Sequence, residues 1–363
     1  MKLTLVAGAR PNFMKIAPLI HALDKAKAAG GGISYQLVHT GQHYDKALSA
    51  YFFEDLGIPL PKINLGAGSG SQAEQTASIM VAFENYLLEN VCDAVIVVGD
   101  VNSTLACAVV AKKMNIDVIH VEGGIRSGDR SMPEEINRLV TDAISDYFFT
   151  TTPEAGENLI REGIDSKQIF FVGNTMIDSL VMTRHRWQKP KFLDEITKHE
   201  GYLVLTLHRP SNVDNPKVMQ SIIDKINLTI KDIPIIFPVH PRTQSRLALV
   251  KLPPHVHITG PMRYLEFMYL LDHCKGVITD SGGIQEETTF LHKPCVTLRD
   301  TTERPETVLL GTNELIGNDS EKLAIALNNI ISGKSKEGTI PQLWDGRTAE
   351  RIVAQLITIY HEN

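Results

Sequence analysis

Short apolar runs alternate with longer segments of mixed polarity along nearly the whole chain. The runs are rich in β-branched residues and lack the polar alternation of a strand with one exposed face. Segments long enough for a crossover helix separate them, so the pattern predicts parallel strands buried on both faces. The first series of runs comprises Leu3–Ala7, Tyr35–Thr40, Ala94–Val98, Val118–Val121, Tyr147–Thr151 and Ile169–Val172, and the second comprises Leu203–Leu207, Ile235–Val239, Val256–Thr259, Gly276–Thr279 and Cys295–Leu298.

A polar segment between the two series indicates a domain boundary. The first series ends at Gly173-Asn174-Thr175, and the stretch RHRWQKPKFLDEITKHEG precedes the second. We therefore expect an α/β protein with two doubly wound Rossmann-like domains, 1–174 and 175–345, that face a central cleft. The helical pattern over 346–363 is expected to pack back on the first domain. The length of 363 residues agrees with two domains of about 150 residues each.

Composition and charge exclude several classes of protein. Hydrophobic residues make up 43% of the chain and charged residues 21%, as in an ordinary globular protein. A formal net charge of −6 argues against a nucleic-acid partner and against a polybasic membrane anchor. The apolar runs are too short for a membrane helix or a signal segment, so we expect a cytoplasmic protein. The cysteines lack metal-site spacing, which predicts buried free thiols and no metal.

Acidic residues follow neighbouring strands of the first half. Ligands of open parallel sheets bind at the carboxyl ends of the strands, so Asp100 and Glu122 are expected at the same edge. Glu134 and Glu135 follow Pro133 at a helix start, where an acid also compensates the helix dipole, and for one of them we expect only that task. Clustered carboxylates raise one another's pKa and suit proton transfer near neutral pH.

The second half offers histidines and an anion site. His208-Arg209 and His240 directly follow strands and can supply further acid–base or binding groups. Ser281-Gly282-Gly283 leads from a strand into a helix, whose N-terminal N–H groups favour an anion.

Cations at other strand or helix starts strengthen the anion site. Arg10, Lys15, Arg209 and Arg304 occupy such positions. Glu287 lies one helical turn after the glycines and can accept hydrogen bonds from ribose hydroxyls. An equally simple explanation is that its carboxylate only caps the helix. The sequence contains neither GxxxxGK[ST] nor a GxGxxG after the first strand, which disfavours an NTPase or a dinucleotide dehydrogenase. The residues thus predict an enzyme that binds a phosphorylated or nucleotide ligand and uses carboxylates for proton transfer, with no metal or redox cofactor.

Nine stretches, in this order, resemble the non-hydrolysing UDP-N-acetylglucosamine 2-epimerases nearly end to end. They are GARPNFMKIAPL, TGQHYD, VVGDVNSTLA, HVEGGIRSGDRSMPEEINR, GNTMIDSL, LTLHRPSNVDN, PVHPRT, TDSGGIQEE and RDTTERPE. The resemblance implies the GT-B architecture and a cytoplasmic homodimer without a cofactor. It also implies supply of UDP-N-acetylmannosamine for cell-surface polysaccharides.

The implied chemistry proceeds by elimination and re-addition. UDP leaves carbon 1 while the proton at carbon 2 is removed, which gives 2-acetamidoglucal, and UDP then adds back with a proton on the opposite face. Matched position by position, the catalytic residues are Asp100, Glu122, Glu134 and His208. The residues matched to UDP binding, or placed beside it by their position after a strand, are Arg10, Lys15, Arg209, His240, Phe267, Ser281, Gly282, Gly283, Glu287 and Arg304.

Two loops depart from the family's usual motifs but keep their acids. Residues 121–126 read VEGGIR where VEAGLR is frequent, and 99–104 read GDVNST where GDTTTT is frequent. Many bacterial members bind a second substrate molecule as an activator through Gln and Arg side chains near the second βα loop. Gln42 and His43 are present here, but the segment 66–70 has no arginine, so activation by substrate is not expected.

Several alternative functions share most of these features. The same reaction on another UDP-sugar, such as UDP-2,3-diacetamido-2,3-dideoxyglucuronate, requires the same acids and one more cation. A hydrolysing relative releases free N-acetylmannosamine and UDP. A GT-B glycosyltransferase has no need of the clustered acids, and neither does a non-catalytic nucleotide-sugar sensor.

Overall fold

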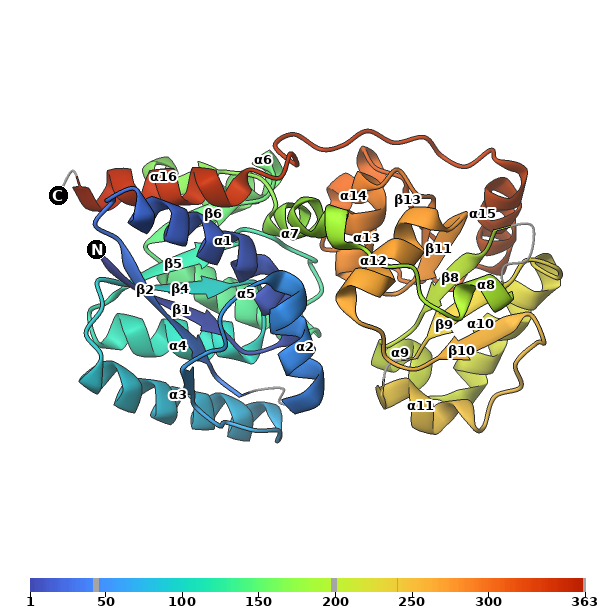
Figure 1. The fold of residues 1–363 in the computed structure, drawn as a ribbon, viewed down its shortest axis with the longest axis horizontal. Helices are drawn as coiled ribbons and strands as arrows, with labels where there is room; N and C mark the ends of the chain where they lie inside the picture. Colours follow the sequence, from blue (N-terminus) through green and yellow to red (C-terminus); the bar gives the residue numbers. More distant parts are fainter. Residues whose placement is uncertain (42–45, 197–200, 240, 362–363) are drawn as a thin grey trace. The chain divides into compact units, whose positions relative to one another are not determined.

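The structure, a computed structural model, describes residues 1–41, 46–196, 201–239 and 241–361 (Figure 1). The chain forms two compact units, each with its own parallel sheet. The first unit contains Met1–Met182 and the segment from Gln342 onward, and the second contains Thr183–Pro341. This confirms the predicted α/β class with two doubly wound sheets. The central cleft stays a prediction.

The first unit is built on a seven-stranded sheet in the order β3-β2-β1-β4-β5-β6-β7. Its pairs are parallel, and β1 lies between β2 and β4, so that Leu5 is opposite both Leu37 and Ile96. Apart from Lys2 at the start of β1, the central strands β1 and β4 are buried because helices cover both faces of the sheet. The strands are β1 Lys2–Ala7, β2 Ser34–His39, β3 Ile63–Asn64, β4 Ala94–Val98, β5 Asp117–Val121, β6 Tyr147–Thr150 and β7 Ile169–Phe171.

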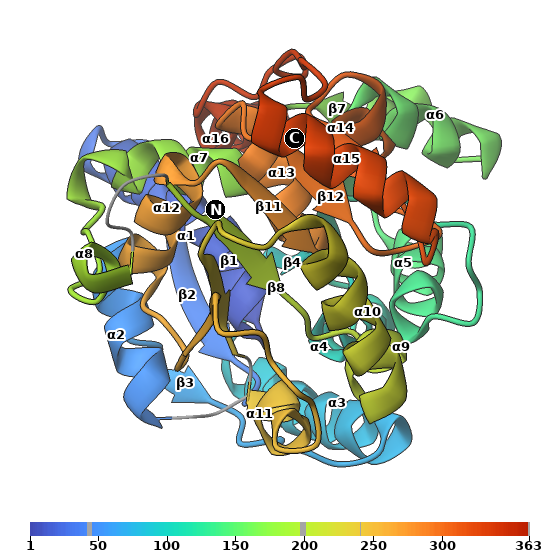
Figure 2. The same ribbon diagram turned by 90° about the vertical axis from the view of Figure 1, so that its right-hand side faces the viewer.

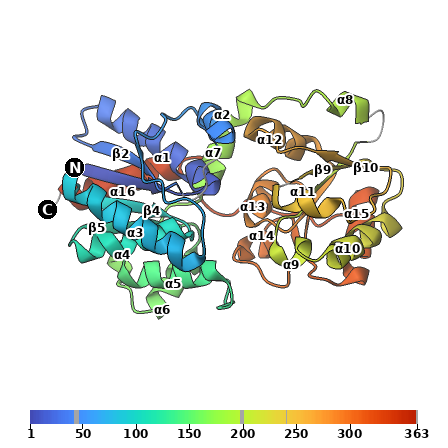
Figure 3. The ribbon, with the colours of Figure 1, turned by 90° about the horizontal axis from the view of Figure 1, so that it is seen from below.

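Helices of the first unit contact one another in sets. Helices α3 and α4 lie side by side, and α4 also contacts α5 (Figure 3). Helix α16 returns to lie beside α1 (Figure 1). One apolar cluster joins Val95 and Val97 of the sheet to Phe83 and Ile79 of α3. The helices are α1 Arg10–Ala28, α2 Lys46–Leu56, α3 Gln72–Glu89, α4 Asn102–Lys113, α5 Pro133–Ile144, α6 Pro153–Arg161, η1 Ser166–Gln168, α7 Thr175–Thr183 and α16 Thr348–His361.

The second unit repeats this plan with a six-stranded parallel sheet in the order β10-β9-β8-β11-β12-β13. Helices α10 and α15 contact each other (Figure 2), and their apolar faces join the strands in one core that includes Leu205, Phe237 and Leu327. The strands are β8 Leu203–Thr206, β9 Ile235–Pro238, β10 Val256–Thr259, β11 Gly276–Thr279, β12 Cys295–Thr297 and β13 Asn313–Leu315. The helices are η2 Arg184–Arg186, α8 Leu193–Ile196, α9 Pro210–Val213, α10 Pro216–Thr229, α11 Pro241–Leu247, α12 Tyr264–His273, α13 Gly282–Phe290, α14 Pro305–Leu309 and α15 Ser320–Ser332.

The two units are divided after Met182, whereas the sequence pattern placed the boundary after residue 174. Helix α7 belongs with the first unit because its side chains bond there. Asp178 accepts hydrogen bonds from the backbone N–H groups of Thr348 (3.1 Å) and Ala349 (2.7 Å) at the start of α16. The hydroxyl of Ser179 donates to the carbonyl of Met14 in α1. The buried carboxylate of Asp178 therefore holds α7, at the end of the first part of this unit, against the start of α16, where the chain returns to the unit.

The structure also bears on disulfide bonds and on membrane-spanning helices. All four cysteines are buried and free, as their scatter along the sequence indicated. Across the described ranges, no helix combines the length and apolar character that crossing a membrane requires.

Asp178 predicts a distinctive pH dependence of stability. Burial raises its pKa to about 6 against the opposing effect of the Thr348 and Ala349 N–H groups, while an unfolded aspartate has a pKa of about 3.9. In the folded state Asp178 therefore stays protonated to a higher pH than in the unfolded state. As the pH rises from about 4 to 6, its contribution to the free energy of unfolding falls by up to about 3 kcal/mol. Asp178→Asn removes this titration, so its unfolding free energy relative to wild type should increase between pH 4.5 and 7 in urea denaturation.

Asp319→Asn is the matched control for that experiment. Asp319 also caps a helix, α15, but it is exposed, and the pKa is lowered by its hydrogen bond from the Lys322 N–H. Its titration therefore lies below the window tested, and its difference from wild type should stay constant there. An equally constant difference for Asp178→Asn would contradict the prediction.

Candidate active site

Asp100 and Glu122 lie at the ends of adjacent strands. Val98 of β4 is opposite Val121 of β5, so the residues that follow them leave the sheet side by side. Gly99 adopts a positive φ of 68° and donates its N–H to the carbonyl of Val121 (3.0 Å). A Cβ at Gly99 would lie 3.0 Å from the ammonium nitrogen of Lys15, so this turn has little room for a side chain.

The carboxylate of Glu122 forms a buried ion pair. Its Oε2 lies 2.6 Å from Nζ of Lys15 in α1, and both side chains are almost fully buried. Glu122 has a left-handed backbone (φ 70°) and donates its N–H to the carbonyl of Phe149 in β6 (2.9 Å). Burying a charge is costly unless a counter-charge accompanies it, and Lys15 provides that compensation.

Asn12 fixes the beginning of α1 relative to β4. Its side-chain oxygen accepts from the N–H groups of Gly8 (3.2 Å) and Ala9 (3.0 Å), and its nitrogen donates to the carbonyl of Val98 (2.9 Å). Arg10, the first residue of α1, is exposed, with its guanidinium carbon 4.9 Å from the centroid of the Phe52 ring. The first turns of α1 thus bring both Arg10 and Lys15 to the carboxyl edge of the sheet.

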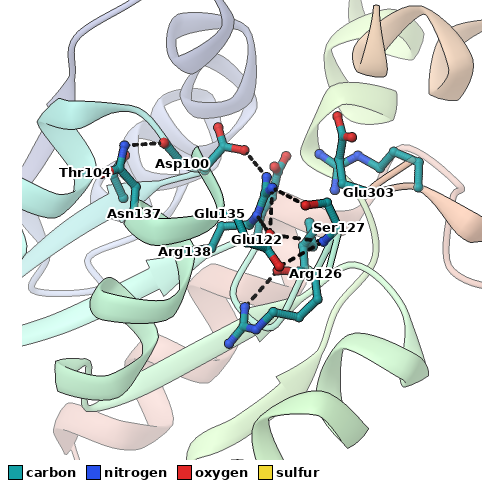
Figure 4. Close-up of polar contacts among 12 residues, drawn as sticks. Asp100, Thr104, Glu122, Arg126, Ser127, Glu135, Asn137, Arg138 and Glu303 are labelled. Carbon is teal, nitrogen blue, oxygen red and sulfur yellow. Dashed lines mark hydrogen bonds and ion pairs between the residues drawn. The ribbon is translucent and has the colours of Figure 1, made fainter. Parts of the chain in front are cut away.

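Helix α5 holds Asp100 through two residues. Arg138 lies between Asp100 and Glu135 and forms an ion pair with each (Figure 4). The side chain of Arg138 is only 3% exposed, while that of Asp100 remains 31% exposed. Asn137 donates to the main-chain carbonyl of Asp100 (2.9 Å). The backbone and the carboxylate of Asp100 are therefore both positioned by the same helix.

The two acids in the first turn of α5 differ in their surroundings. Glu135 is buried and accepts hydrogen bonds from the N–H groups of Ser127 (3.0 Å) and Gly128 (2.9 Å) and from Nε of Arg138 (2.8 Å). Burial raises the pKa of Glu135, but these donors outweigh it, and the pKa lies below its ordinary value. Glu134 is half-buried and precedes Asn137 and Arg138 by three and four residues, so it shares the helix face that holds Asp100.

In the second unit, His208 is oriented by a buried aspartate. Asp280, which follows β11, has no exposed side-chain surface and lies 2.7 Å from Nδ1 of His208. It also accepts from the N–H of Arg209 (2.9 Å) and from the amide of Asn212 (3.0 Å). Burial opposes ionisation, but the bond to His208 and the other donors keep the pKa of Asp280 below its usual range. The imidazole, 39% exposed, is thereby fixed in one orientation.

Arginines gather near the start of α13. Glu303 forms ion pairs with Arg299 (2.6 Å) and Arg209 (3.7 Å), and Arg304 pairs with Glu286 of α13 (2.8 Å). Burial raises the pKa of Glu303, but the hydrogen bond and charge of Arg299, with the other arginines, lower it to about 2.

Gly282, the first residue of α13, packs directly against this group. A Cβ there would lie 2.4 Å from Oε1 of Glu303, so a side chain at this position would displace that carboxylate. The N-terminus of a helix beside arginines forms an environment that favours an anion.

Comparison with known proteins identifies the family. The model of the UDP-N-acetylglucosamine 2-epimerase family matches residues 25–357. The chain belongs to this family. A UDP-N-acetylglucosamine 2-epimerase of Methanocaldococcus jannaschii is 43% identical, over 97% of this chain and 98% of that protein. The crystal structure of M. jannaschii UDP-GlcNAc 2-epimerase in complex with UDP-GlcNAc and UDP matches 99% of this chain and 100% of that chain, with a TM-score of 0.89.

Another relative carries a different substrate name. The UDP-2,3-diacetamido-2,3-dideoxy-D-glucuronate 2-epimerase of Pseudomonas aeruginosa is 37% identical, over 98% of this chain and 99% of that protein. Members of the epimerase family named for two different sugars therefore both align with nearly the whole chain.

The structure brings together some of the residues predicted for this family member. In the first unit, Asp100, Glu122, Lys15 and the helix bearing Glu134 share the sheet edge, and in the second His208 and Arg209 meet at Asp280. Lys15 and Arg304, which were assigned to UDP, are partnered with Glu122 and Glu286, and their contact with UDP stays a prediction.

Further residues predicted to bind UDP lie in the second unit. Ser281, Gly282 and Gly283 form the start of α13, Glu287 is buried in it, and Phe267 is half-buried in α12. Gln42, His43 and His240 lie outside the described residues.

Sequence reasoning missed the residues that hold the predicted ones. Arg138 and Asn137 hold Asp100, and Asp280 orients His208. Asp280 stands inside the quoted motif TDSGG, so its place directly after a strand was the available signal. In the described part of the chain, no group of three or more His, Cys, Asp and Glu residues is arranged to hold a metal ion.

The different surroundings of Glu134 and Glu135 can be tested by stability. Glu135→Gln replaces one acceptor oxygen with a donor that faces N–H groups, so the unfolding free energy should fall by about 1–3 kcal/mol. Amide hydrogen exchange at Ser127 and Gly128 should also accelerate. Glu134→Gln is the matched control and should stay within about 0.5 kcal/mol of wild type. Equal stability of both variants would show that Glu135 does not hold this loop.

Proposed function

We propose that the protein catalyses the reversible C2 epimerisation of UDP-N-acetylglucosamine to UDP-N-acetylmannosamine. The observation that carries the proposal is the 43% identity, over nearly the whole chain, to the M. jannaschii UDP-N-acetylglucosamine 2-epimerase. The acid cluster at the carboxyl edge of the first sheet supports it, because this reaction removes a proton from one face of carbon 2 and returns one to the other.

The proposed mechanism needs no redox step. The C1–O bond to UDP breaks as the C2 proton is removed, which leaves the C1–C2 double bond of 2-acetamidoglucal and free UDP. In the second step UDP adds back to carbon 1 of the intermediate, and carbon 2 receives a proton on the face opposite to the one that lost it, which gives the C2 epimer. Asp100, Glu122 and Glu134 are the proposed acid–base groups, because Asp100 and Glu122 are positioned at one sheet edge and Glu134 shares the helix face that holds Asp100.

The second unit is proposed to bind UDP. Diphosphate departure requires positive charge where the negative charge develops. The start of α13, with Arg209, Arg299 and Arg304 nearby, supplies N–H donors and guanidinium groups. His208, oriented by Asp280, is the proposed further active-site group of this unit. Arg10 and Lys15, at the sheet edge of the first unit, are proposed additional diphosphate contacts, as their motif positions suggest.

A second candidate function is the same reaction on UDP-2,3-diacetamido-2,3-dideoxyglucuronate. The 37% identity to the P. aeruginosa enzyme of that name favours it over unrelated chemistry. This sugar carries a carboxylate, whose binding calls for one more cation. The higher identity to the M. jannaschii enzyme makes UDP-N-acetylglucosamine the first candidate.

Assembly and pathway belong to the same proposal. We infer a cytoplasmic homodimer that supplies UDP-N-acetylmannosamine for cell-surface polysaccharides, as the family resemblance implies. Helix α3 supports an interface between copies, because it exposes Val81 and Leu88, which are one heptad apart and so lie on one helix face.

The reaction predicts deuterium at carbon 2 of both sugars. In deuterated water with UDP-N-acetylglucosamine, NMR should show UDP-N-acetylmannosamine formed with deuterium at carbon 2. Release of free sugar and UDP would identify a hydrolysing enzyme instead. Turnover of the diacetamido uronate alone would establish the second candidate, and turnover only with an added acceptor would indicate a glycosyltransferase.

The acid–base assignment predicts that three isosteric variants lose turnover. Asp100→Asn, Glu122→Gln and Glu134→Gln should each lower kcat by about 10²-fold or more, while UDP binding measured by calorimetry persists. Glu154→Gln is the matched control, because Glu154 follows Pro153 at the start of α6 as Glu134 follows Pro133 in α5. It should keep full activity. A variant with undiminished kcat would remove its residue from the acid–base group.

A further inference from the structure

His120 lies in β5 beneath the two loops that carry Asp100 and Glu122. Its ring has no exposed surface and contacts a different group through each nitrogen. Nδ1 is 2.6 Å from Oδ1 of Asp142 in α5, and Nε2 is 2.8 Å from the carbonyl oxygen of Gly99. Gly99 directly precedes Asp100, so the imidazole touches the turn that presents that carboxylate.

Asp142 completes the arrangement from the other side. Its carboxylate accepts hydrogen bonds from the N–H of Gly124 (3.0 Å) and from a terminal nitrogen of Arg126 (2.7 Å). Gly124 belongs to the loop that follows Glu122. Burial raises the pKa of Asp142, but His120 and Arg126 outweigh this effect, and the pKa lies below its usual value.

The hydrogen-bond partners decide the state of the imidazole. Gly99 offers a carbonyl and Asp142 an ionised carboxylate, and both can only accept. An imidazole that donates through both nitrogens, an imidazolium, satisfies both of these acceptors. Arg126 also pairs with Glu162 (2.5 Å), so with an imidazolium the four side chains contain two positive and two negative charges. A buried group of this kind is balanced in charge, and its hydrogen bonds to the two loops are charge-assisted.

We propose that the His120–Asp142 pair is a positioning device that sets the separation of the Asp100 and Glu122 carboxylates. The imidazolium holds the carbonyl of Gly99 on one loop, and the carboxylate holds the N–H of Gly124 on the other. The inference rests on the proposed epimerase function, since it gives these two carboxylates their task. Neither His120 nor Asp142 acts on the substrate, and both are positioning residues.

Two substitutions of His120 separate its two bonds. In His120→Gln the amide nitrogen takes the place of Nε2 and can still donate to the Gly99 carbonyl. In His120→Asn the amide nitrogen takes the place of Nδ1 and keeps the bond to Asp142, while the bond to Gly99 is lost. A small displacement of a catalytic group costs up to about 10²-fold in rate, so kcat should fall by about tenfold or more in His120→Asn and less in His120→Gln.

The readouts distinguish positioning from a general loss of structure. Calorimetric titration with UDP counts folded, binding-competent molecules, and its dissociation constant should remain unchanged in both variants. kcat per binding-competent molecule should follow the order wild type, Gln, Asn. Equal kcat in all three proteins would overturn the proposal, as would a kcat of the Asn variant that equals or exceeds that of the Gln variant.

A second measurement does not depend on activity or on a folded variant. Nitrogen NMR of wild-type protein labelled in its histidines should show protons on both ring nitrogens of His120, with a scalar coupling from Nε2–H to the Gly99 carbonyl. A singly protonated ring, or no coupling, would overturn the inference even if the variants fail to fold. If wild type does not epimerise UDP-N-acetylglucosamine but shows both NMR signatures, the proposed function fails while the hydrogen-bonded device itself stands.

Discussion

The buried ion pair between Lys15 and Glu122 constrains the whole edge of the first sheet. Glu122 brings a carboxylate into an almost fully buried position, which is costly without a counter-charge. Helix α1 must therefore begin where Lys15 can reach β5, and Asn12 fixes that beginning by bonding the end of β4. Gly99 has a left-handed backbone, and a Cβ there would lie 3.0 Å from the ammonium nitrogen, so a residue with a side chain would be strained at this turn. The arrangement of the chain at the ends of β1, β4 and β5 is thus tied to the need to compensate the buried charge of Glu122.

Most of the fold could be predicted because burial on both faces leaves a strong trace in the sequence. Strands such as β4, with the sequence AVIVV, have no polar position to obscure them. The strands β3 and β13 were not predicted, for different reasons. Strand β3, Ile63–Asn64, is too short to form a hydrophobic pattern. Strand β13, Asn313–Leu315, lies at the edge of its sheet and contains two polar residues, so it does not read as an apolar run. The pattern leaves open where in the segment between the two strand series the units divide, because the contacts that join α7 to α1 and α16 are not local in sequence.

The residues of the candidate site could be predicted only where they directly follow a strand. Asp100, Glu122 and His208 directly follow strands, and the rule for parallel sheets selects them. Arg138 stands in a polar helix segment, where a buried arginine has the same local signature as an exposed one. Asp280 belongs to a motif that suggested a phosphate loop, but its carboxylate orients His208. Identifying such supporting residues requires knowledge of which elements are neighbours in space.

The distribution of charge, more than its total of −6, matches the tasks proposed for the two units. Around Asp100 and Glu122, the cations Lys15 and Arg138 are accompanied by four acids, because Glu134 and Glu135 share the helix that holds Asp100. Near the start of α13, Arg209, Arg299 and Arg304 lie beside Glu303 and Glu286, and the helix start adds N–H donors. Proton transfer at carbon needs a surplus of carboxylates, and a leaving diphosphate needs a surplus of cations and N–H donors. Each task therefore depends on its own local set of charges, so the formal total of −6 does not oppose the binding of an anionic ligand.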